Sequence, residues 1–226
     1  MSEIITIDGP SSSGKDTVGK MLAQKLGYQF IDTGAMYRAF TLFNLEKNIS
    51  LNDSPKVTQT SKQANMEFKI VNGGQRVFLN NQDVTDLLHS KKVTDAVPII
   101  AAIPEVRVNA KQLQRKLAEQ KDTVMAGRDI GTVIFPDAKL KFFITASSQV
   151  RAQRRWQQQK SSRPDVTLKQ IQKEIEDRDQ KDSTRSASPL KVPDGAIIID
   201  TSNLDINQTL DELLKHCRLS IDKNSI

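Results

Sequence analysis

The stretch GPSSSGKDT, residues 9–17, combines the residue types that bind phosphate groups. It lies between the apolar segment IITID and a segment of helical period, which is the order of elements that a phosphate-binding loop requires. Gly9 and Gly14 let the backbone curl so that successive N–H groups face one point. Lys15 adds a positive charge, and the start of the helix adds its partial charge. We therefore predict that this loop binds a nucleotide polyphosphate.

One residue departs from the common pattern, in which a hydroxyl follows the lysine directly. Asp16 stands in that place, and the hydroxyl comes one residue later, at Thr17. The backbone cradle does not depend on this side chain, and a carboxylate is favourable in the first turn of a helix. We expect the Asp16 side chain to point outward and Thr17 to lie near the phosphates.

A second loop, DTGAMYR, follows the next predicted strand. Thr33 is the predicted N-cap of the helix after it, and Arg38 lies about one turn inside that helix. Arg38 has two interpretations. It is a solvated side chain, or it binds a second phosphate at the carboxyl edge of the sheet, where open α/β sheets hold their ligands.

A third loop, AGRDIGT, follows another predicted strand and places glycines on both sides of Arg128 and Asp129. The two charges could form a simple ion pair. The alternative is that Arg128 binds a phosphate and Asp129 reads a base, because an aspartate accepts naturally from the exocyclic amino group of cytosine.

Arginines recur at helical spacing in the second half of the chain. One predicted helix face carries Arg151, Arg154 and Arg155, and another carries Arg178, Asp182 and Arg185. Solvated helix faces explain many such runs. Phosphate binding is favoured here because arginine, which suits bidentate contacts, is used in place of lysine. The carboxylate between two guanidiniums would also restrain their side chains.

Apolar runs alternate with segments of helical period, which is typical of a mostly parallel sheet covered by helices. The predicted strands are residues 4–7, 28–32, 124–126, 140–145 and 196–200. The predicted helices are residues 15–26, 35–47, 147–159, 167–185 and 206–216, with a capping box at Thr167 and Gln170. We therefore expect an α/β protein with a three-layer α/β/α core, in a single domain over residues 1–226.

The middle of the chain interrupts this alternation. Residues 65–71 and 76–80 alternate in polarity around Asn72-Gly73-Gly74, which predicts an antiparallel hairpin in a small inserted subdomain, about residues 60–100. A polar break at residues 160–165 divides the two arginine-rich helices, and we expect about residues 148–166 to form a mobile helical lid.

Composition narrows the class of protein. The 226 residues are 37% hydrophobic, enough for a packed core, and they contain no apolar run long enough for a membrane helix. Cys217 is the single cysteine, so no disulfide forms within the chain, and residues 1–9 do not resemble a signal peptide. The net charge of +6 favours an anionic partner, while an aromatic content of 5% leaves few stacking platforms for nucleic acid. We expect a cytoplasmic monomer with no membrane or nucleic-acid partner.

With these loops placed, the sequence resembles the bacterial cytidylate kinases, a family of P-loop nucleoside monophosphate kinases. The resemblance covers nearly the whole chain and rests on GPSSSGKDT, IDTGAMYR, DVTDLL, AAIPEVR, AGRDIGTVIFPDA and DRDQKDSTRSASPL, in the family's order and spacing. It implies a P-loop fold that transfers the γ-phosphate of ATP to CMP or dCMP with Mg²⁺, in pyrimidine nucleotide metabolism. It also accounts for Thr17, because the family's threonine stands two places after the lysine.

The resemblance also implies roles for single residues. ATP would be bound by Gly9, Pro10, Ser11, Ser12, Ser13, Gly14, Lys15, Asp16, Thr17 and Arg151, with Thr17 near the nucleotide-bound Mg²⁺. The acceptor would be bound by Asp32, Thr33, Arg38, Arg107, Arg128, Asp129, Arg178, Asp182 and Arg185. Among these, Arg38, Arg128 and Arg185 would hold the acceptor phosphate, Thr33, Arg107 and Asp129 would read cytosine, and Arg178 with Asp182 would meet the ribose. Catalysis would depend on Lys15, Arg128, Arg154, Arg155 and Arg185.

One position departs from the family's pattern. Nine residues before Arg107 the family usually has a serine that helps to bind cytosine, and this chain has Pro98. Proline brings neither a hydroxyl nor an N–H. We expect weaker discrimination of cytosine, or a backbone carbonyl in place of the missing partner.

Other functions share the phosphate loop. A kinase of UMP or shikimate is permitted by the loop alone, although the cytosine-reading residues and the hairpin insert argue against it. A regulatory GTPase or motor-type ATPase is the alternative from another class, since residues 196–200 form an apolar strand with an acidic end. No Asn-Lys-x-Asp guanine motif occurs, however, and Asp200 is more simply the end of a buried strand.

Overall fold

The structure, a computed structural model, describes residues 2–71, 74–161 and 163–223. The chain divides into two compact units. The first consists of Met1–Phe30 with Lys121–Ile226, and the second is Ile31–Gln120.

The first unit contains a parallel sheet whose strands take the order β2-β6-β1-β7-β8. The strands are β1 (Ile4–Asp8), β2 (Gln29–Asp32), β6 (Thr123–Gly127), β7 (Leu140–Thr145) and β8 (Ile197–Asp200), and the last two residues of β2 belong to the second unit. β1 pairs in parallel with β6 and β7, and β7 pairs in parallel with β8. The predicted parallel sheet is confirmed.

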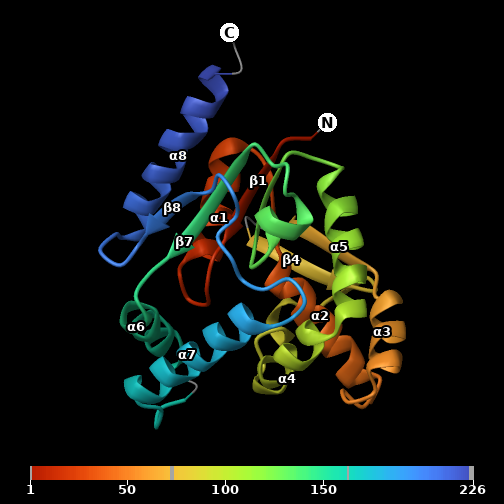
Figure 1. The fold of residues 1–226 in the computed structure, drawn as a ribbon. Helices are drawn as coiled ribbons and strands as arrows, with labels where there is room; N and C mark the ends of the chain where they lie inside the picture. The colour runs from red at the N-terminus through yellow and green to blue at the C-terminus, as the bar shows by residue number, and fades with distance from the viewer. Residues whose placement is uncertain (1, 72–73, 162, 224–226) are drawn as a thin grey trace. The chain divides into compact units, whose positions relative to one another are not determined.

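Two helices, α1 (Lys15–Leu26) and α8 (Ile206–Lys223), pack together over one face of this sheet (Figure 1). The core between them contains Ile5, Ile7, Leu22 and Leu213, all fully buried or nearly so. Because successive side chains of a strand alternate between faces, Thr6 and Asp8 point to the opposite face. That face carries η2 (Ile130–Ile134), one turn of π-helix.

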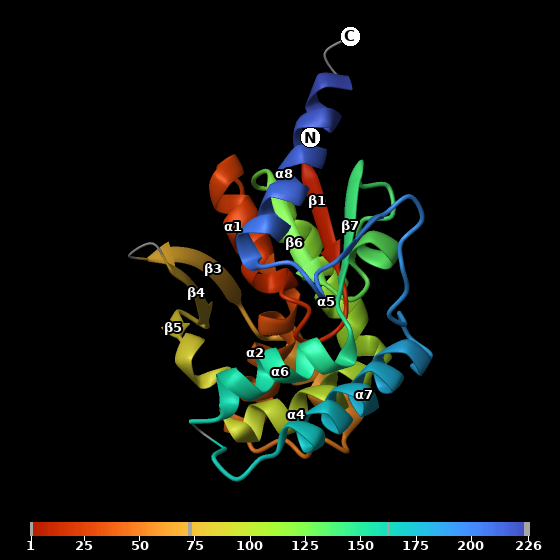
Figure 2. The ribbon, with the colours of Figure 1, turned by 90° about the vertical axis from the view of Figure 1, so that its left-hand side faces the viewer.

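The two arginine-rich helices, α6 (Ser148–Gln159) and α7 (Leu168–Thr184), lie side by side (Figure 2). Ala152, Ile171 and Ile175 form a small core of their own between them. The predicted capping box is confirmed, since the Thr167 hydroxyl accepts from the Gln170 N–H and the Gln170 side chain accepts from the Thr167 N–H. The pair is therefore a helical hairpin with a separate core.

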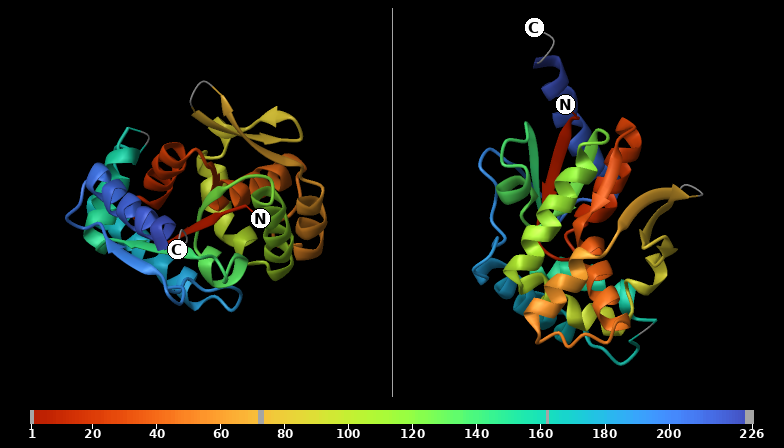
Figure 3. Two further views of the ribbon diagram at one scale, coloured as in Figure 1. Left: turned by 90° about the horizontal axis from the view of Figure 1, so that it is seen from above. Right: turned by 90° about the vertical axis from the view of Figure 1, so that its right-hand side faces the viewer.

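The second unit is mainly helical with a small antiparallel sheet (Figure 3). The sheet contains β3 (Met66–Val71), β4 (Gly74–Leu79) and β5 (Gln82–Asp83), so the predicted hairpin is confirmed, although residues 72 and 73 of its turn lie outside the described residues. The helices are α2 (Thr33–Glu46), α3 (Ser54–Lys62), α4 (Lys91–Ala102) and α5 (Pro104–Ala118), with the short 3₁₀ turn η1 (Thr85–Leu87). Their core contains Met36, Phe40, Ile100 and Val106.

Several predicted boundaries were wrong. α2 begins at Thr33, two residues early, because the Asp32 carboxylate caps it by accepting from the N–H groups of Gly34 and Ala35; Thr33 was the predicted cap. β8 is an edge strand, with Ile198 58% exposed, rather than a buried one. α8 continues seven residues beyond the predicted end. In the described part of the chain, no helix is both apolar and long enough to span a membrane.

Candidate active site

The phosphate loop, residues 9–17, joins β1 to α1 in a tightly curved backbone. A Cβ on Gly9 would overlap the carbonyl oxygen of Ile144, so only glycine fits this approach to β7. Ser12 and Gly14 take left-handed conformations, with φ of 61° and 92°. Left-handed residues in a turn bring neighbouring N–H groups to one side, which is the conformation of an anion-binding nest.

Side chains from outside the loop hold its carbonyl groups. The Arg151 guanidinium donates to the Ser11 carbonyl at 3.3 Å, and the Arg154 guanidinium donates to the Ser13 carbonyl at 3.2 Å. The Thr201 hydroxyl donates to the same Ser13 oxygen at 3.2 Å. The C=O and the N–H of one peptide unit point in opposite directions. When the Ser11 and Ser13 carbonyls face these side chains, the N–H groups of Ser12 and Gly14 therefore point away from them. The loop is thus fixed from its outer side.

Lys15 and Asp16 contact each other at the start of α1. The Lys15 ammonium lies 3.3 Å from an Asp16 carboxylate oxygen and 3.4 Å from the Pro10 carbonyl. The Asp16 side chain is half exposed, so the expectation that it points outward holds only in part. Thr17 is exposed on the first turn of α1. Asp16 thus contacts the ammonium that is predicted to bind phosphate.

A second cluster joins the loop of residues 127–131 to the end of α7. Asp182 accepts from Arg128 Nε at 3.0 Å and lies 3.5 Å from an Arg185 nitrogen. Burial raises the pKa of Asp182, but the charges of Arg128, Arg178 and Arg185 outweigh it and hold the pKa below its usual value. The carboxylate therefore stays ionised and orients two guanidiniums.

Asp129 is 6% exposed and stands in the same loop, directly before η2. The backbone after it is held by Asp8, whose carboxylate accepts from the N–H groups of Ile130 and Gly131 at 2.8 and 2.7 Å. Burial of Asp8, opposed by these two bonds and aided by the charge of Asp129, raises its pKa to about 6. Two carboxylates thus lie near each other in the buried end of the loop.

The other predicted acceptor residues lie in the second unit. Arg38 donates to the Leu88 carbonyl at 3.1 Å and to the Thr94 hydroxyl at 2.9 Å. Arg107 is 7% exposed, donates to the Ala101 carbonyl at 3.0 Å, and places its guanidinium 5.4 Å from the centre of the Tyr37 ring. Both arginines are therefore held in one orientation by partners within this unit. Asp32 serves as a helix cap, and Thr33 is buried beside it.

The three arginines of α6 differ in their surroundings. Arg151 is buried, donates to the Ala146 carbonyl at 2.8 Å, and pairs with Asp179 at 2.7 Å. Arg154 donates to the Thr201 carbonyl at 2.7 Å as well as to Ser13. Arg155 makes no comparable backbone bond in the described part of the chain, and burial lowers the pKa of its guanidinium. Arg151 and Arg154 thus support the loop backbone.

The donor set suits magnesium carried by a nucleotide. In residues 2–71, 74–161 and 163–223, no three His, Cys, Asp or Glu side chains are grouped as a metal site. Thr17 offers one hydroxyl on the first turn of α1. Mg²⁺ commonly takes only one or two protein oxygens and completes its shell with phosphates and water.

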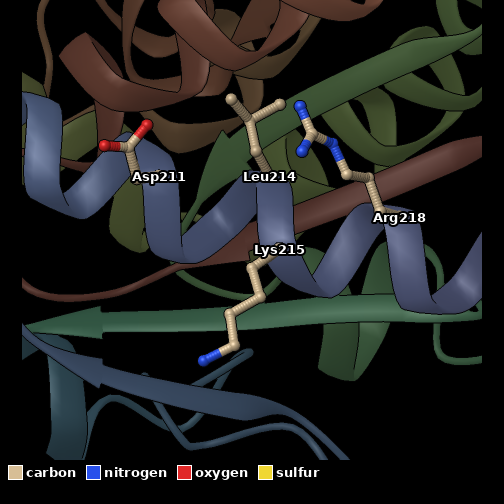
Figure 4. A pocket seen from close by; sticks show the side chains of 4 residues that line it. All are labelled: Asp211, Leu214, Lys215 and Arg218. Atoms are coloured by element: carbon tan, nitrogen blue, oxygen red, sulfur yellow. The ribbon is translucent and has the colours of Figure 1, made fainter.

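A shallow pocket on α8 lies apart from these residues in the sequence (Figure 4). It is lined by Asp211, Leu214, Lys215 and Arg218, which all belong to one helix, and none of them is a predicted site residue.

Sequence reasoning missed three residues that shape the site: Asp8, Asp179 and Thr201. Asp8 carried a usable signal, since a carboxylate at the carboxyl end of a buried parallel strand lies where α/β sheets bind ligands. Asp179 and Thr201 carried none, because both lie outside the phosphate loop that they help to hold, and their partners, Arg151 and Arg154, are not their neighbours in the sequence.

A glycine-curved loop between a central parallel strand and a helix, with a buried lysine at its end, defines a P-loop protein. The chain belongs to the cytidylate kinase family, because the family model described as cytidylate kinase matches residues 5–219.

Individual relatives agree. Over 221 residues the chain is 44% identical to the cytidylate kinase of Caldanaerobacter subterraneus subsp. tengcongensis, covering 98% of this chain and 95% of the relative. Over 209 residues it is 45% identical to the cytidylate kinase of Exiguobacterium sibiricum, covering 92% and 94%. A solved structure of an uncharacterized protein from Eubacterium ventriosum is similar in fold alone, with a TM-score of 0.51, 13% identity, and coverage of 95% and 98%.

Proposed function

We propose that this protein transfers the γ-phosphate of ATP to CMP or dCMP, forming ADP and CDP or dCDP. The observation that carries the proposal is membership of the cytidylate kinase family over residues 5–219. The phosphate loop, the contacts of Asp182 with Arg128 and Arg185, and the burial of Asp129 support the proposal, because these groups could bind the two nucleotides.

On the donor side, the loop N–H groups and Lys15 would bind the ATP phosphates. We propose that Arg155 supplies the direct arginine contact to these phosphates, because Arg151 and Arg154 are engaged with loop carbonyls. If about residues 148–166 close as a lid, water would be excluded from the transferring group.

On the acceptor side, Arg128, Arg185 and Arg38 would bind the phosphate of CMP. Asp129 would accept from the cytosine amino group, Arg107 would donate to N3 or O2, and Thr33 would add a hydroxyl. Uracil presents an acceptor where cytosine presents the amino group, so the carboxylate disfavours it. Arg178 and Asp182 would contact the ribose.

The transfer needs no covalent intermediate on the protein, because an oxygen of the acceptor phosphate attacks in line. Lys15 and the arginines stabilise the charge that spreads over the transferring group. Thr17 would be the side chain that contacts a nucleotide-bound Mg²⁺, which would supply neutralisation of the charge on the ATP phosphates.

Three further proposals come from the sequence. We propose a role in pyrimidine nucleotide metabolism, a cytoplasmic location and a monomeric state. Small-molecule nucleotides are then the only substrates, without a nucleic-acid or membrane partner.

The experiment that tests the function is an acceptor panel. ATP and Mg²⁺ are supplied with CMP, dCMP, UMP, AMP or shikimate, and ADP release is followed by a coupled assay. We expect ADP release with CMP and dCMP and much slower release with the others. Equal rates with UMP would contradict the proposed base readout, and release with shikimate alone would favour the alternative kinase.

A further inference from the structure

Asp8 is a buried carboxylate between two functional loops. It is 0% exposed, it directly precedes Gly9 of the phosphate loop, and it stands on the face of β1 that carries η2. Both of its carboxylate oxygens accept backbone N–H groups, from Ile130 at 2.8 Å and from Gly131 at 2.7 Å. These two residues directly follow Asp129, so one side chain connects the start of the phosphate loop to the loop of residues 127–131.

The charge at this position is unfavourable for folding at neutral pH. Burial raises the pKa of Asp8 to about 6. The folded protein therefore stabilises the ionised Asp8 carboxylate less well than water does. Its neighbours on the flanking strands, Gly127 and Phe143, carry no charge. Asp129 adds repulsion, while the charge of Arg128 favours the anion without outweighing the effect of burial. A buried charge that lowers stability is typical of a residue that serves a site.

The loop it holds has little room to shift. A Cβ on Gly131 would lie 2.9 Å from the Thr6 hydroxyl oxygen and 2.9 Å from Pro193 Cγ. Asp129 is buried at the same end of the loop, and Arg128 is oriented by Asp182. Small movements of residues 130–131 would therefore move the carboxylate of Asp129.

We propose that Asp8 is a positioning residue for the acceptor nucleotide. Its two hydrogen bonds to the N–H groups of residues 130 and 131 fix the positions of the Asp129 and Arg128 side chains. This inference rests on the proposed function, since it assigns the acceptor to the loop of residues 127–131. The phosphate loop itself is held independently, by Arg151, Arg154 and Thr201. Loss of Asp8 should therefore impair acceptor binding more than ATP binding.

The test is Asp8→Asn, which keeps the shape but replaces one acceptor oxygen by a donor that faces a backbone N–H. We expect the KM for CMP to rise about tenfold or more, while the KM for ATP changes by less than about twofold. The matched control is Asp205→Asn, because Asp205 also accepts two backbone N–H groups, from Asn207 at 2.8 Å and Gln208 at 2.9 Å, but is exposed. The control should leave both KM values unchanged.

A second variant keeps the carboxylate. Gly131→Ala pushes the same loop against Thr6 and Pro193, and we expect it also to raise the KM for CMP selectively. Equal rises in the two KM values, or an unchanged KM for CMP in both variants, would overturn the proposal.

Amide hydrogen exchange separates this inference from the proposed function. In Asp8→Asn the N–H groups of Ile130 and Gly131 should exchange about tenfold faster than in wild type, without substrate present. If these N–H groups exchange faster in Asp8→Asn but the wild-type protein does not phosphorylate CMP, the proposed function is refuted and the role of Asp8 in holding residues 130 and 131 stands. Unchanged exchange would refute the anchoring role whatever the activity.

Discussion

At the scale of single residues, the contact between Lys15 and Asp16 bears on the proposed binding of ATP. Lys15 is 3% exposed and its ammonium lies 3.3 Å from Asp16, where an ATP phosphate would otherwise be its main anionic partner. The Asp16 side chain is half exposed, so solvent weakens the pair. The carboxylate therefore reduces, but does not abolish, the attraction of the lysine for phosphate.

Replacing this carboxylate should strengthen ATP binding. In Asp16→Ser we expect the KM for ATP to fall about two- to fivefold, because an exposed ion pair contributes at most ~1 kcal/mol. Initial rates at fixed CMP and varied ATP measure the change. Asp137→Ser, at another exposed aspartate, is the control and should have no effect. A KM for ATP that stays constant or rises would contradict this explanation.

Asp129 should decide the choice of base. In Asp129→Ala we expect kcat/KM for CMP to fall about 10- to 100-fold, since a hydrogen bond to a buried charge is lost. The KM for ATP should remain within about twofold, because the phosphate loop is held by other residues. If the preference for CMP over UMP is the same in the variant, Asp129 does not read the base.

Local residue patterns predicted the phosphate loop well, because its strand, glycines and lysine are contiguous. They did not predict Asp8, whose hydrogen-bond partners lie 122 and 123 residues further along the chain. They also read Thr33 as the cap of α2, although Asp32 one residue earlier makes both capping bonds. Asp and Thr are both favourable N-cap residues, so residue type alone does not show which of two adjacent positions caps the helix.

At the scale of elements, strands with strong apolar runs and helices with clear caps were predictable, including the hairpin and α7. α4 and α5 were not predicted, because Pro98 lies inside α4 and Pro104 opens α5, and proline usually marks a helix boundary. β8 was predicted to be a buried core strand, but it lies at the edge of the sheet. An apolar strand sequence does not show how many neighbours the strand has.

Pro98 leaves the carbonyl of Thr94 without the helical N–H that residue 98 would normally donate. In Pro98→Ser we expect that bond to return and the free energy of unfolding to rise by about 1–2 kcal/mol. The ratio of kcat/KM for CMP to that for UMP should also rise, about fivefold, because the family's serine hydroxyl is restored.

Pro98→Ala is the matched control, since it restores the N–H without the hydroxyl. It should gain stability and leave the CMP to UMP ratio unchanged. A ratio that rises equally in both variants would show that the helix backbone, rather than the hydroxyl, controls base choice.

At the scale of the whole molecule, Asp8 should make stability depend on pH. Its folded pKa of about 6 exceeds the value of 3.8 for an unperturbed aspartate, so the folded state binds more protons between these pH values. The stability of wild type relative to Asp8→Asn should therefore fall by roughly 2 kcal/mol as pH rises from about 4 to 7. Arg128 and Asp129 are the charged groups that act on it.

Urea unfolding of both proteins across this pH range measures the difference. Asp182 acts in the opposite direction, because its lowered pKa adds stability that is lost as pH falls, and it is common to both proteins. A difference between the two proteins that does not vary with pH would show that Asp8 is not the titrating group.

The two compact units divide the candidate residues between them. The phosphate loop, the arginines of α6 and the Arg128–Asp182–Arg185 cluster lie in the first unit, and Arg38 and Arg107 lie in the second. The sequence predicted an inserted subdomain of about residues 60–100, whereas the second unit extends over Ile31–Gln120 and also includes α2, α3 and α5.

The central claim is that CMP accepts a phosphate from ATP at the phosphate loop. The most direct measurement is chromatographic detection of CDP after incubation of the protein with ATP, Mg²⁺ and CMP, using Lys15→Met as the blank. We expect CDP and ADP to form in equal amounts with wild type and to fall by orders of magnitude in the blank. ADP without CDP, or CDP formed equally by the Lys15→Met protein, would contradict the claim.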